Sequence, residues 1–402
     1  MKSDPLPGAV CALGLAQIVA WGTAYYCLGV LAGPISADTG WSRSLVYFGF
    51  TLALLAMGAV SPAVGRAIDR HGARIVMAVG TVLISGGLAA LALVRSEAAY
   101  LAVWVVLGLG MRMSLYDAAF AALVQVLPSR GRLAISYLTL FGAFASTVFW
   151  VAGHYLNQSA GWRQTLIAFA LINLVCLPLN WFGLARRESP RPGADPSSAA
   201  ASAHDGPPLA GRMRAVAMGL FALVMSLNGF VFAVVTVQLV PLLEAAGLAT
   251  AAAVWVASLK GFAQFGGRLV EIVFGRSLRA ITVARIAIGV LPAAFALLYL
   301  AGGSLRLVVA FTLLMGASQG VVTIVRGAVP LALFGPAGYG AVLGVIATPI
   351  LVVNAVSPTI FALIVDRWGW HVAQVVLVAV AAASCLAMEV MSRWYERRRR
   401  RG

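Results

Sequence analysis

Residues 75–94 read IVMAVGTVLISGGLAALALV, a run without a single charged side chain. A helix of about 20 apolar residues is long enough to cross the roughly 30 Å hydrocarbon core of a bilayer. Runs of similar length recur from Ala9 to Met391. Because they do not alternate between polar and apolar residues, they predict transmembrane helices and exclude a β-barrel.

The composition of the whole chain agrees with a membrane protein. Hydrophobic residues make up 61% of the 402 residues and charged residues 10%, whereas soluble proteins carry about 25% charged residues. We predict an all-α membrane protein with twelve transmembrane helices, six on each side of a polar segment. The predicted spans are residues 9–32, 44–65, 74–94, 99–126, 133–156, 163–184, 215–242, 250–273, 281–301, 305–331, 338–364 and 370–391.

The two halves carry landmarks at a constant displacement. Each of four pairs is separated by 208 residues: Gly108 and Gly316, Pro128 and Pro336, Gly161 and Gly369, and Trp162 and Trp370. This indicates duplication, so the two six-helix bundles should be pseudo-symmetric, with a binding site near the midplane between them. The expected organisation is an N-terminal bundle (1–185), a flexible Pro- and Ser-rich linker (186–214), a C-terminal bundle (215–392) and a basic tail (393–402).

The net charge of +16 is explained by topology. With a cytoplasmic N-terminus, 19 lysines and arginines fall in cytoplasmic segments and five in outer loops. The positive-inside rule therefore predicts that both termini and the linker face the cytoplasm, in a multi-pass protein of the cytoplasmic membrane. A nucleic-acid partner is not expected.

The most specific motif lies between the second and third predicted spans. Its sequence, Gly65-Arg66-Ala67-Ile68-Asp69-Arg70-His71-Gly72-Ala73-Arg74, resembles the signature between helices 2 and 3 of the major facilitator superfamily. The two glycines would allow close helix approach and a tight reversal. The acid and the surrounding bases would form a cytoplasmic charge latch that breaks during rocking, unless the loop is an ordinary basic turn. The motif residues are Gly65, Arg66, Asp69, Arg70, Gly72 and Arg74.

Five cations fall within predicted spans, where an ionisable side chain is costly and is a functional candidate by default. They are Arg112, Lys260, Arg268, Arg285 and Arg326. A cavity with more cations than acids favours an anionic substrate.

Arg268 ends the segment Gly261-Phe262-Ala263-Gln264-Phe265-Gly266-Gly267-Arg268. This segment resembles one in helix 8 of the monocarboxylate transporters, whose arginine engages the substrate carboxylate. The loop 33–43 also resembles the loop after helix 1 of that branch and its oxalate/formate relatives. A guanidinium matches a carboxylate bidentately. Gln264 stands where those transporters carry the proton-linked aspartate. Alternatively, Arg268 pairs with Glu271, one helical turn away, and is structural.

Asp117 is the one acid deep within a predicted span. The 208-residue displacement relates it to Val325, next to Arg326, so Asp117 and Arg326 are candidates for an inner gate that protonation of Asp117 would weaken. The alternative is a static ion pair that only compensates burial. Arg112, five residues before Asp117, is expected near the opposite helical face, as a second anion contact or a group that reaches water.

Further polar side chains are candidates either for the cavity wall or for packing and interhelical hydrogen bonds. They are Tyr25, Tyr26, Tyr116, Asn228, Lys260, Gln264 and Gln319.

These observations predict a secondary transporter that moves a small, monocarboxylate-like organic anion by alternating access, with proton coupling as an option. The alternatives are an exporter of drug-like or other toxic molecules and a non-transporting receptor or scaffold. The four histidines share no site and no P-loop occurs, so we expect neither an enzyme nor a nucleotide-driven pump. We expect a monomer in the bilayer, without cofactor or metal.

Overall fold

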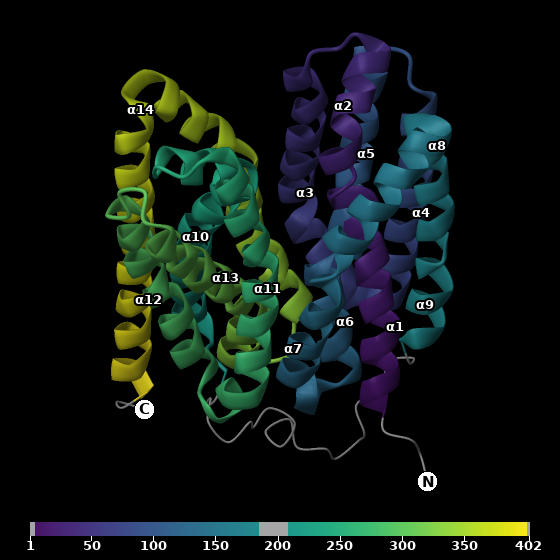
Figure 1. Ribbon diagram of the computed structural model, residues 1–402. Coiled ribbons are helices and arrows are strands. Elements are labelled where there is room, and N and C mark those ends of the chain that lie inside the picture. The colour runs from purple at the N-terminus through teal and green to yellow at the C-terminus, as the bar shows by residue number, and fades with distance from the viewer. Residues whose placement is uncertain (1–4, 185–207, 400–402) are drawn as a thin grey trace. The chain divides into compact units, whose positions relative to one another are not determined.

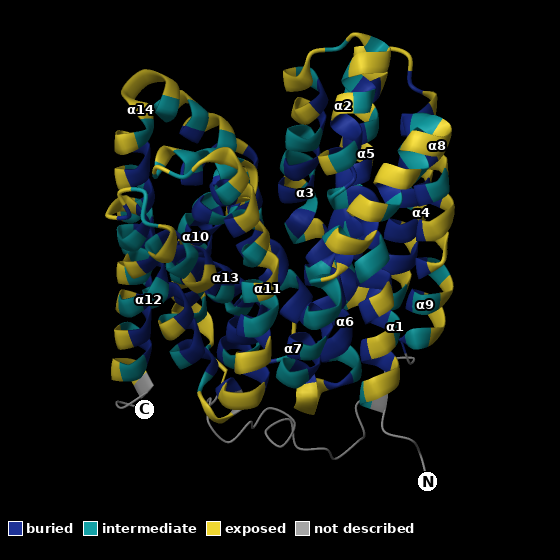
Figure 2. Cartoon of the chain, viewed as in Figure 1, coloured by how far each residue is buried: buried dark blue, intermediate teal, exposed yellow. Residues whose placement is uncertain are grey.

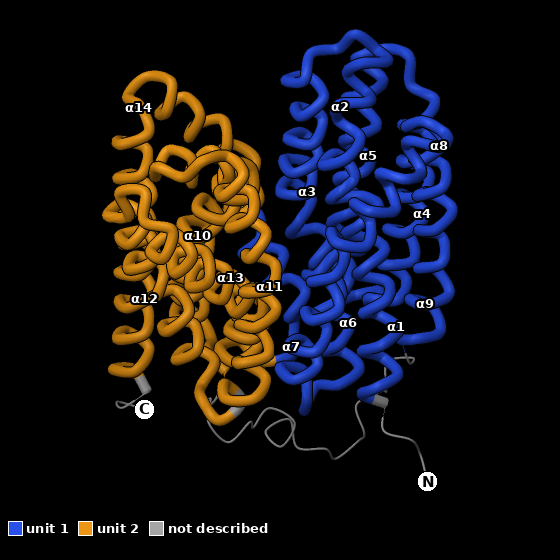
Figure 3. The backbone as a smooth tube through the Cα atoms, in the orientation of Figure 1, with its two compact units in different colours: residues 1–200, 336–348 blue, residues 201–335, 349–402 orange. Residues whose placement is uncertain are grey.

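The computed structural model describes residues 5–184 and 208–399, and the regular structure within them is helical (Figure 1). The chain divides into two compact units (Figure 3): residues 1–200 with 336–348, and residues 201–335 with 349–402. Most of the predicted linker (186–214) and the last residues of the predicted tail (400–402) lie outside the described residues.

The first unit contains eleven helical elements in the described residues before the linker. They are α1 (Pro5–Ala20), η1 (Trp21–Tyr25), α2 (Leu28–Thr39), α3 (Arg43–His71), α4 (Ala73–Leu93), α5 (Glu97–Ser114), α6 (Tyr116–Val126), η2 (Pro128–Arg130), α7 (Gly131–Gly142), α8 (Ala145–Leu174) and α9 (Cys176–Gly183).

The second unit is built from α10 onward, and the first turns of its last helix cluster with the first unit. Its elements are α10 (Gly211–Ala245), α11 (Thr250–Phe274), η3 (Gly275–Ser277), α12 (Ala280–Tyr299), α13 (Leu305–Phe334) and α14 (Tyr339–Arg399). Residues from α10 to α14 share one buried apolar core, in which the rings of Phe295 and Phe311 lie 5.2 Å apart.

Twelve spans can be followed through these helices. Nine continuous helical segments of the described chain are long and apolar enough to cross a membrane. Two of them, Pro128–Gly183 and Tyr339–Arg398, are each long enough for two spans and are interrupted by a glycine with non-helical backbone angles. The remaining span is α11, which carries Lys260, Arg268 and Glu271.

The internal repeat is visible in the backbone of the two interrupted segments. Gly161 has φ 84° and ψ 168°, and Gly369, 208 residues later, has φ 77° and ψ 172°. These positive φ values favour glycine over any residue with a Cβ atom. The same displacement relates Gly108, packed on the α3 backbone at Ala53, to Gly316, packed on the α11 backbone at Lys260. The two halves therefore use the same helix contact and the same reversal.

Many of the residues that are exposed on each unit (Figure 2) have large apolar side chains. Leu93 is 74% exposed, Phe262 78% and Phe182 80%. In a soluble protein so much exposed apolar surface would drive association. In a bilayer the same surface contacts lipid tails, so the burial pattern agrees with the composition.

Candidate functional site

The first predicted span is not one uninterrupted α-helix. α1 ends at Ala20, the π-helical turn η1 covers Trp21–Tyr25, and α2 begins at Leu28. Single π-helical turns inside α-helices are frequent at functional sites. The small residues of η1 are buried, while the aromatic side chains at its two ends are half-buried.

Trp21 lies at the centre of an aromatic cluster in the first unit. Its ring centroid is 4.6 Å from that of Tyr25, 5.9 Å from that of Tyr26 and 5.0 Å from that of Tyr116. Phe50 extends the cluster, 4.9 Å from Tyr25. Tyr25, Tyr26 and Tyr116, three candidates from the sequence analysis, thus lie around Trp21, which the sequence analysis did not propose. Such rings offer broad apolar faces together with hydroxyl groups that can hydrogen-bond.

The fourth predicted span is broken at Leu115. α5 ends at Ser114 and α6 begins at Tyr116, with Leu115 in an extended conformation between them. Gln17 Nε2 donates to the Ser114 carbonyl at 2.8 Å, and Gln17 Oε1 accepts from Trp21 Nε1 at 3.1 Å. Gln17 is fully buried and links the break to the aromatic cluster. The sequence analysis missed Gln17, although a lone amide in an apolar span is a recognisable signal.

The break at Leu115 brings Arg112 and Asp117 together. An unbroken helix would put two residues five positions apart near opposite faces, and that expectation is wrong here. Arg112 Nη1 lies 2.5 Å from Asp117 Oδ2, and the two side chains are only 3% and 6% exposed. Asp117 also stands in the first turn of α6, where the helix dipole favours a negative charge. The first unit therefore contains a buried ion pair.

The other four intramembrane cations, among them Arg285 and Arg326, belong to the second unit. Arg285 on α12 makes two hydrogen bonds to the Glu389 carboxylate on α14, at 2.9 and 3.0 Å. Arg326 is half-buried on α13. Since Asp117 belongs to the first unit, the gate between Asp117 and Arg326 stays a prediction.

Arg268 lies on α11, where this helix packs closely on α13. A Cβ atom at Gly320 would collide with the backbone of Gln264, so glycine allows the two helices to approach each other. Arg268 is 6% exposed, and its Nε lies 3.4 Å from the Gly320 carbonyl oxygen. Glu271, the alternative partner, is also buried, at 5% exposed. Lys260, two turns earlier, is half-buried with its Nζ 5.7 Å from the ring centroid of Phe232.

Three amide side chains of the second unit have polar atoms without a hydrogen-bond partner in the described part of the chain. These atoms are Asn228 Nδ2, Gln319 Nε2 and Asn354 Oδ1. Asn228 and Gln319 are 2% and 3% exposed. A Cβ atom at Gly229 would lie 2.6 Å from Asn354 Oδ1, which places Asn354 beside α10. Buried polar atoms are normally paired, so these amides need an explanation. The sequence analysis nominated Asn228 and Gln319 and missed Asn354.

The motif loop holds the start of α14. Asp69 accepts hydrogen bonds from the backbone N–H groups of Gly340 and Ala341, at 2.9 and 2.7 Å. This stretch of α14 clusters with the first unit. A Cβ atom on Gly65 would collide with the Gly340 carbonyl, and Gly72 has φ 87°. Both glycines thus occupy positions that only glycine fits, while the partner of Asp69 is a helix N-terminus, which attracts a carboxylate.

The described residues contain no group of three His, Cys, Asp or Glu side chains that could hold a metal ion. The polar groups described above are amides, aromatic rings, arginines and carboxylates. Such groups bind a solute by hydrogen bonds and charge.

The sequence matches the Major Facilitator Superfamily over residues 13–302. None of the curated protein sequences matches it. A crystal structure of the human organic anion transporter MFSD10 (TETRAN) is similar with a TM-score of 0.76 and 17% identity, covering 96% of this chain and 100% of that one. The proton:xylose symporter XylE bound to 6-bromo-6-deoxy-D-glucose is similar with a TM-score of 0.71 and 14% identity, covering 96% of each chain. The chain belongs to the Major Facilitator Superfamily of membrane transporters.

Proposed function

We propose that this protein moves a small organic anion, of the monocarboxylate class, across the cytoplasmic membrane by alternating access. The observation that carries the proposal is the burial of the Arg268 side chain in a membrane-spanning helix, with its Nε 3.4 Å from the Gly320 carbonyl oxygen of α13. An arginine within a membrane span is a functional candidate by default. A carboxylate would supply both the opposite charge and a bidentate partner.

The amides of the second unit support the same class of substrate. Asn228 Nδ2 and Gln319 Nε2 are donors without a partner in the described residues, and an unpaired buried donor costs about 1–3 kcal/mol. A substrate with carboxylate and carbonyl oxygens would remove this cost when it binds. Gln264, whose backbone lies against Gly320, and Lys260 are further candidates on α11.

The similar structures support transport and leave the substrate open. One is described as an organic anion transporter and the other as a proton:xylose symporter. A shared fold does not determine a shared substrate. The proposal that the substrate is an anion therefore depends on the cations in the spans of this chain, which outnumber the acids there.

Two carboxylates are proposed to act in the transport cycle. Asp69 would hold the first turn of α14 in one state and release it in another, as a latch in the loop that the positive-inside distribution assigns to the cytoplasm. Asp117 would couple transport to protons, because protonation would weaken its interaction with Arg112. Its predicted partnership with Arg326 belongs to the same proposal.

Uptake into liposomes tests the role of Arg268. The purified protein, given an inward proton gradient and labelled monocarboxylates, should accumulate one of them. Arg268→Lys keeps the positive charge and loses the planar guanidinium. The KM should therefore rise about tenfold, which corresponds to the loss of roughly one charge-assisted hydrogen bond. The melting temperature should not change. Arg285→Lys is the matched control, because Arg285 pairs with Glu389, and its KM should not change.

The structural role of Arg268 predicts the opposite pattern. If Arg268 only satisfies Glu271, both Arg268→Lys and Glu271→Gln should lower the melting temperature and leave the KM unchanged. That result would reject the carboxylate site and leave the transporter fold intact.

Export of apolar, drug-like solutes is a second candidate, favoured by the aromatic cluster around Trp21. Rings that are tilted against one another at centroid distances of 4.6–5.9 Å suit a flat apolar solute. Cells that express the protein would then resist toxic aromatic compounds, and Trp21→Ala would remove the resistance. Resistance that survives Arg268→Ala, without any monocarboxylate uptake, would favour this function.

A further inference from the structure

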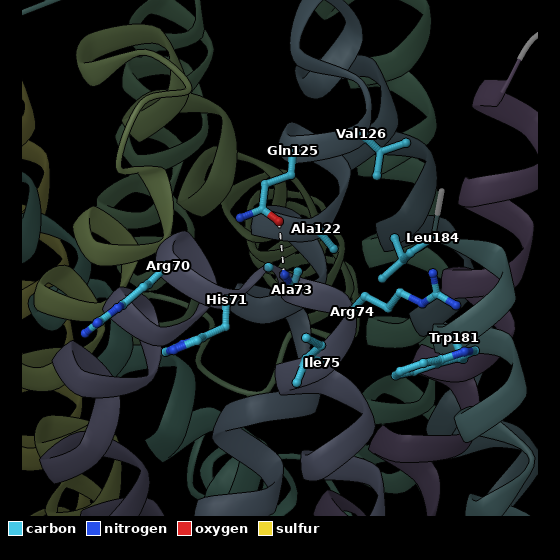
Figure 4. Close-up of a pocket in the computed structure, with 11 residues that line it drawn as sticks. Arg70, His71, Ala73, Arg74, Ile75, Ala122, Gln125, Val126, Trp181 and Leu184 are labelled. Carbon is cyan, nitrogen blue, oxygen red and sulfur yellow. Dashed lines mark hydrogen bonds between the residues drawn. The ribbon is translucent and has the colours of Figure 1, made fainter. Parts of the chain in front are cut away.

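We propose that the first unit binds the headgroup of an anionic phospholipid in a pocket at the junction of α3 and α4 (Figure 4). The pocket has a volume of about 400 Å³ and is bordered by residues of α3, α4, α6 and α9. This site is separate from the substrate site proposed above and does not depend on it.

The pocket is basic. Arg70, His71 and Arg74 line it, and no aspartate or glutamate does. The guanidinium carbon of Arg74 lies 4.2 Å from the ring centroid of Trp181, and Figure 4 shows the side chain extending toward this ring. The Nε atom of Arg74 is buried and has no hydrogen-bond partner in the described residues. A guanidinium held against an indole in this way keeps its N–H groups for an acceptor.

The backbone of the pocket adds to the positive potential. α4 starts here, without a side-chain cap from Gly72 and without an acid in its first turn. Gln125 of α6 fixes the junction, because its Oε1 accepts from Ala73 N and its Nε2 donates to the Ile68 carbonyl, both at 3.0 Å. The remaining N–H groups and the helix dipole favour an anion. Arg74 and the α4 N-terminus thus offer complementary donors to a phosphate.

The apolar surroundings favour a lipid as the source of that phosphate. Ile75 at the pocket edge is 49% exposed and Trp181 41%, and the neighbouring Phe182 is 80% exposed. Side chains this apolar and exposed face acyl chains in a bilayer, and tryptophan is enriched at the membrane interface. A lipid could therefore place its phosphate on Arg74 and its chains along α4 and α9. Basic pockets between helices on the cytoplasmic side are known to bind lipid headgroups in this manner.

Native mass spectrometry of the full-length protein tests the site. The protein is equilibrated in detergent with equal amounts of phosphatidylglycerol and phosphatidylcholine, and the bound lipids are counted. We expect phosphatidylglycerol to be retained, and Arg74→Gln to reduce its retention about fivefold, the effect of one cation near the lipid surface. Arg70→Gln, which changes an exposed side chain and spares the Trp181 stack, should reduce retention as well if Arg74→Gln does not fold.

Arg163→Gln is the matched control. Its guanidinium carbon lies 4.2 Å from the ring centroid of Trp162, the same geometry as Arg74 and Trp181, but Arg163 does not line the pocket. This variant should retain phosphatidylglycerol like the unmodified protein. Equal retention of the two lipids, or retention that survives Arg74→Gln and Arg70→Gln, would overturn the proposal. If inorganic phosphate raises the melting temperature as much as phosphatidylglycerol does, the ligand of the pocket is a soluble phosphate and the lipid proposal is wrong.

Discussion

The carboxylate of Asp69 accepts a hydrogen bond from the backbone N–H of Ala341, 272 residues away in the sequence, at 2.7 Å. Its other oxygen accepts from Gly340 at 2.9 Å. The first turn of α14 contains no acid of its own, so the negative charge at this N-terminus comes from Asp69 in the last turn of α3. The contact ties a residue near the end of the second predicted span to the start of the eleventh.

Removal of the Asp69 carboxylate should loosen this contact. Asp69→Ala should destabilise the protein by about 1 kcal/mol, the typical value of a helix N-cap, and Asp69→Asn by less, because the amide can still accept. The melting temperature of the purified protein measures both effects. Asp38→Asn changes a carboxylate that is 53% exposed. Because an exposed ion pair contributes little to stability, this variant should lower the melting temperature less than Asp69→Ala does. Equal melting temperatures for Asp69→Ala and Asp38→Asn would contradict the cap.

A Cβ atom at Gly65 should separate α3 from α14. Gly65→Ala would push against the Gly340 carbonyl, and overpacking of this kind costs about 1–3 kcal/mol. Transport in liposomes should fall as the latch fails to close. Gly86→Ala is the matched control, since a Cβ atom at Gly86 would meet nothing within 4 Å, and it should behave like the unmodified protein. A fully active Gly65→Ala variant would show that the close approach has no role.

The buried pair of Arg112 and Asp117 should be sensitive to the loss of one partner. Asp117→Asn would leave the guanidinium without its counter-charge and should destabilise the protein by about 3–5 kcal/mol. The double variant Arg112→Met with Asp117→Leu should recover much of this loss, because no buried charge remains. Denaturant unfolding in detergent would measure the cycle. Additive losses in the double variant would mean that the two side chains do not act as a pair.

The effect of Asp117 on coupling can be measured in the same variant. If Asp117 takes part in proton coupling, uptake by Asp117→Asn should no longer respond to an imposed proton gradient, while exchange of labelled for unlabelled substrate continues. An unchanged pH dependence of uptake would end the coupling hypothesis.

The side-chain amide of Gln319 should contribute more to substrate binding than to the stability of the fold. Its Nε2 is buried without a partner in the described residues, so Gln319→Leu removes an unsatisfied group and should leave the melting temperature unchanged or raise it. Uptake should nevertheless fall at least tenfold, a loss of about 1.4 kcal/mol of substrate binding. Thr312→Val tests another polar position of α13, whose hydroxyl donates to Val308 within the helix, and should retain uptake. Normal uptake by Gln319→Leu would remove Gln319 from the substrate site.

Much of the fold could be predicted from the sequence because the relevant signals are local. A run such as 75–94 is long enough to span a bilayer whatever its neighbours are. The displacement of 208 residues predicted related halves, and Gly161 and Gly369 have matching backbone angles. Gly72 likewise has the positive φ that its tight reversal requires.

The details of the sites depended on contacts between distant residues. Residues 111–117 contain neither glycine nor proline to signal the break at Leu115. The Ser114 carbonyl at the break accepts a hydrogen bond from Gln17, 97 residues earlier. The prediction of one continuous helix over residues 99–126 therefore placed Arg112 and Asp117 near opposite helical faces, which is wrong.

Hydrophobicity determined that this chain enters the membrane and where most of its spans lie, because lipid requires every backbone group of a span to be paired within its own helix. Which polar groups meet was decided by the tertiary structure. Arg112 pairs with Asp117 across a helix break, Asp69 accepts hydrogen bonds from the N-terminus of α14, and three tyrosines pack around Trp21. In an apolar surrounding each polar group takes the partner that the packed helices bring within reach, and sequence distance does not reveal that partner.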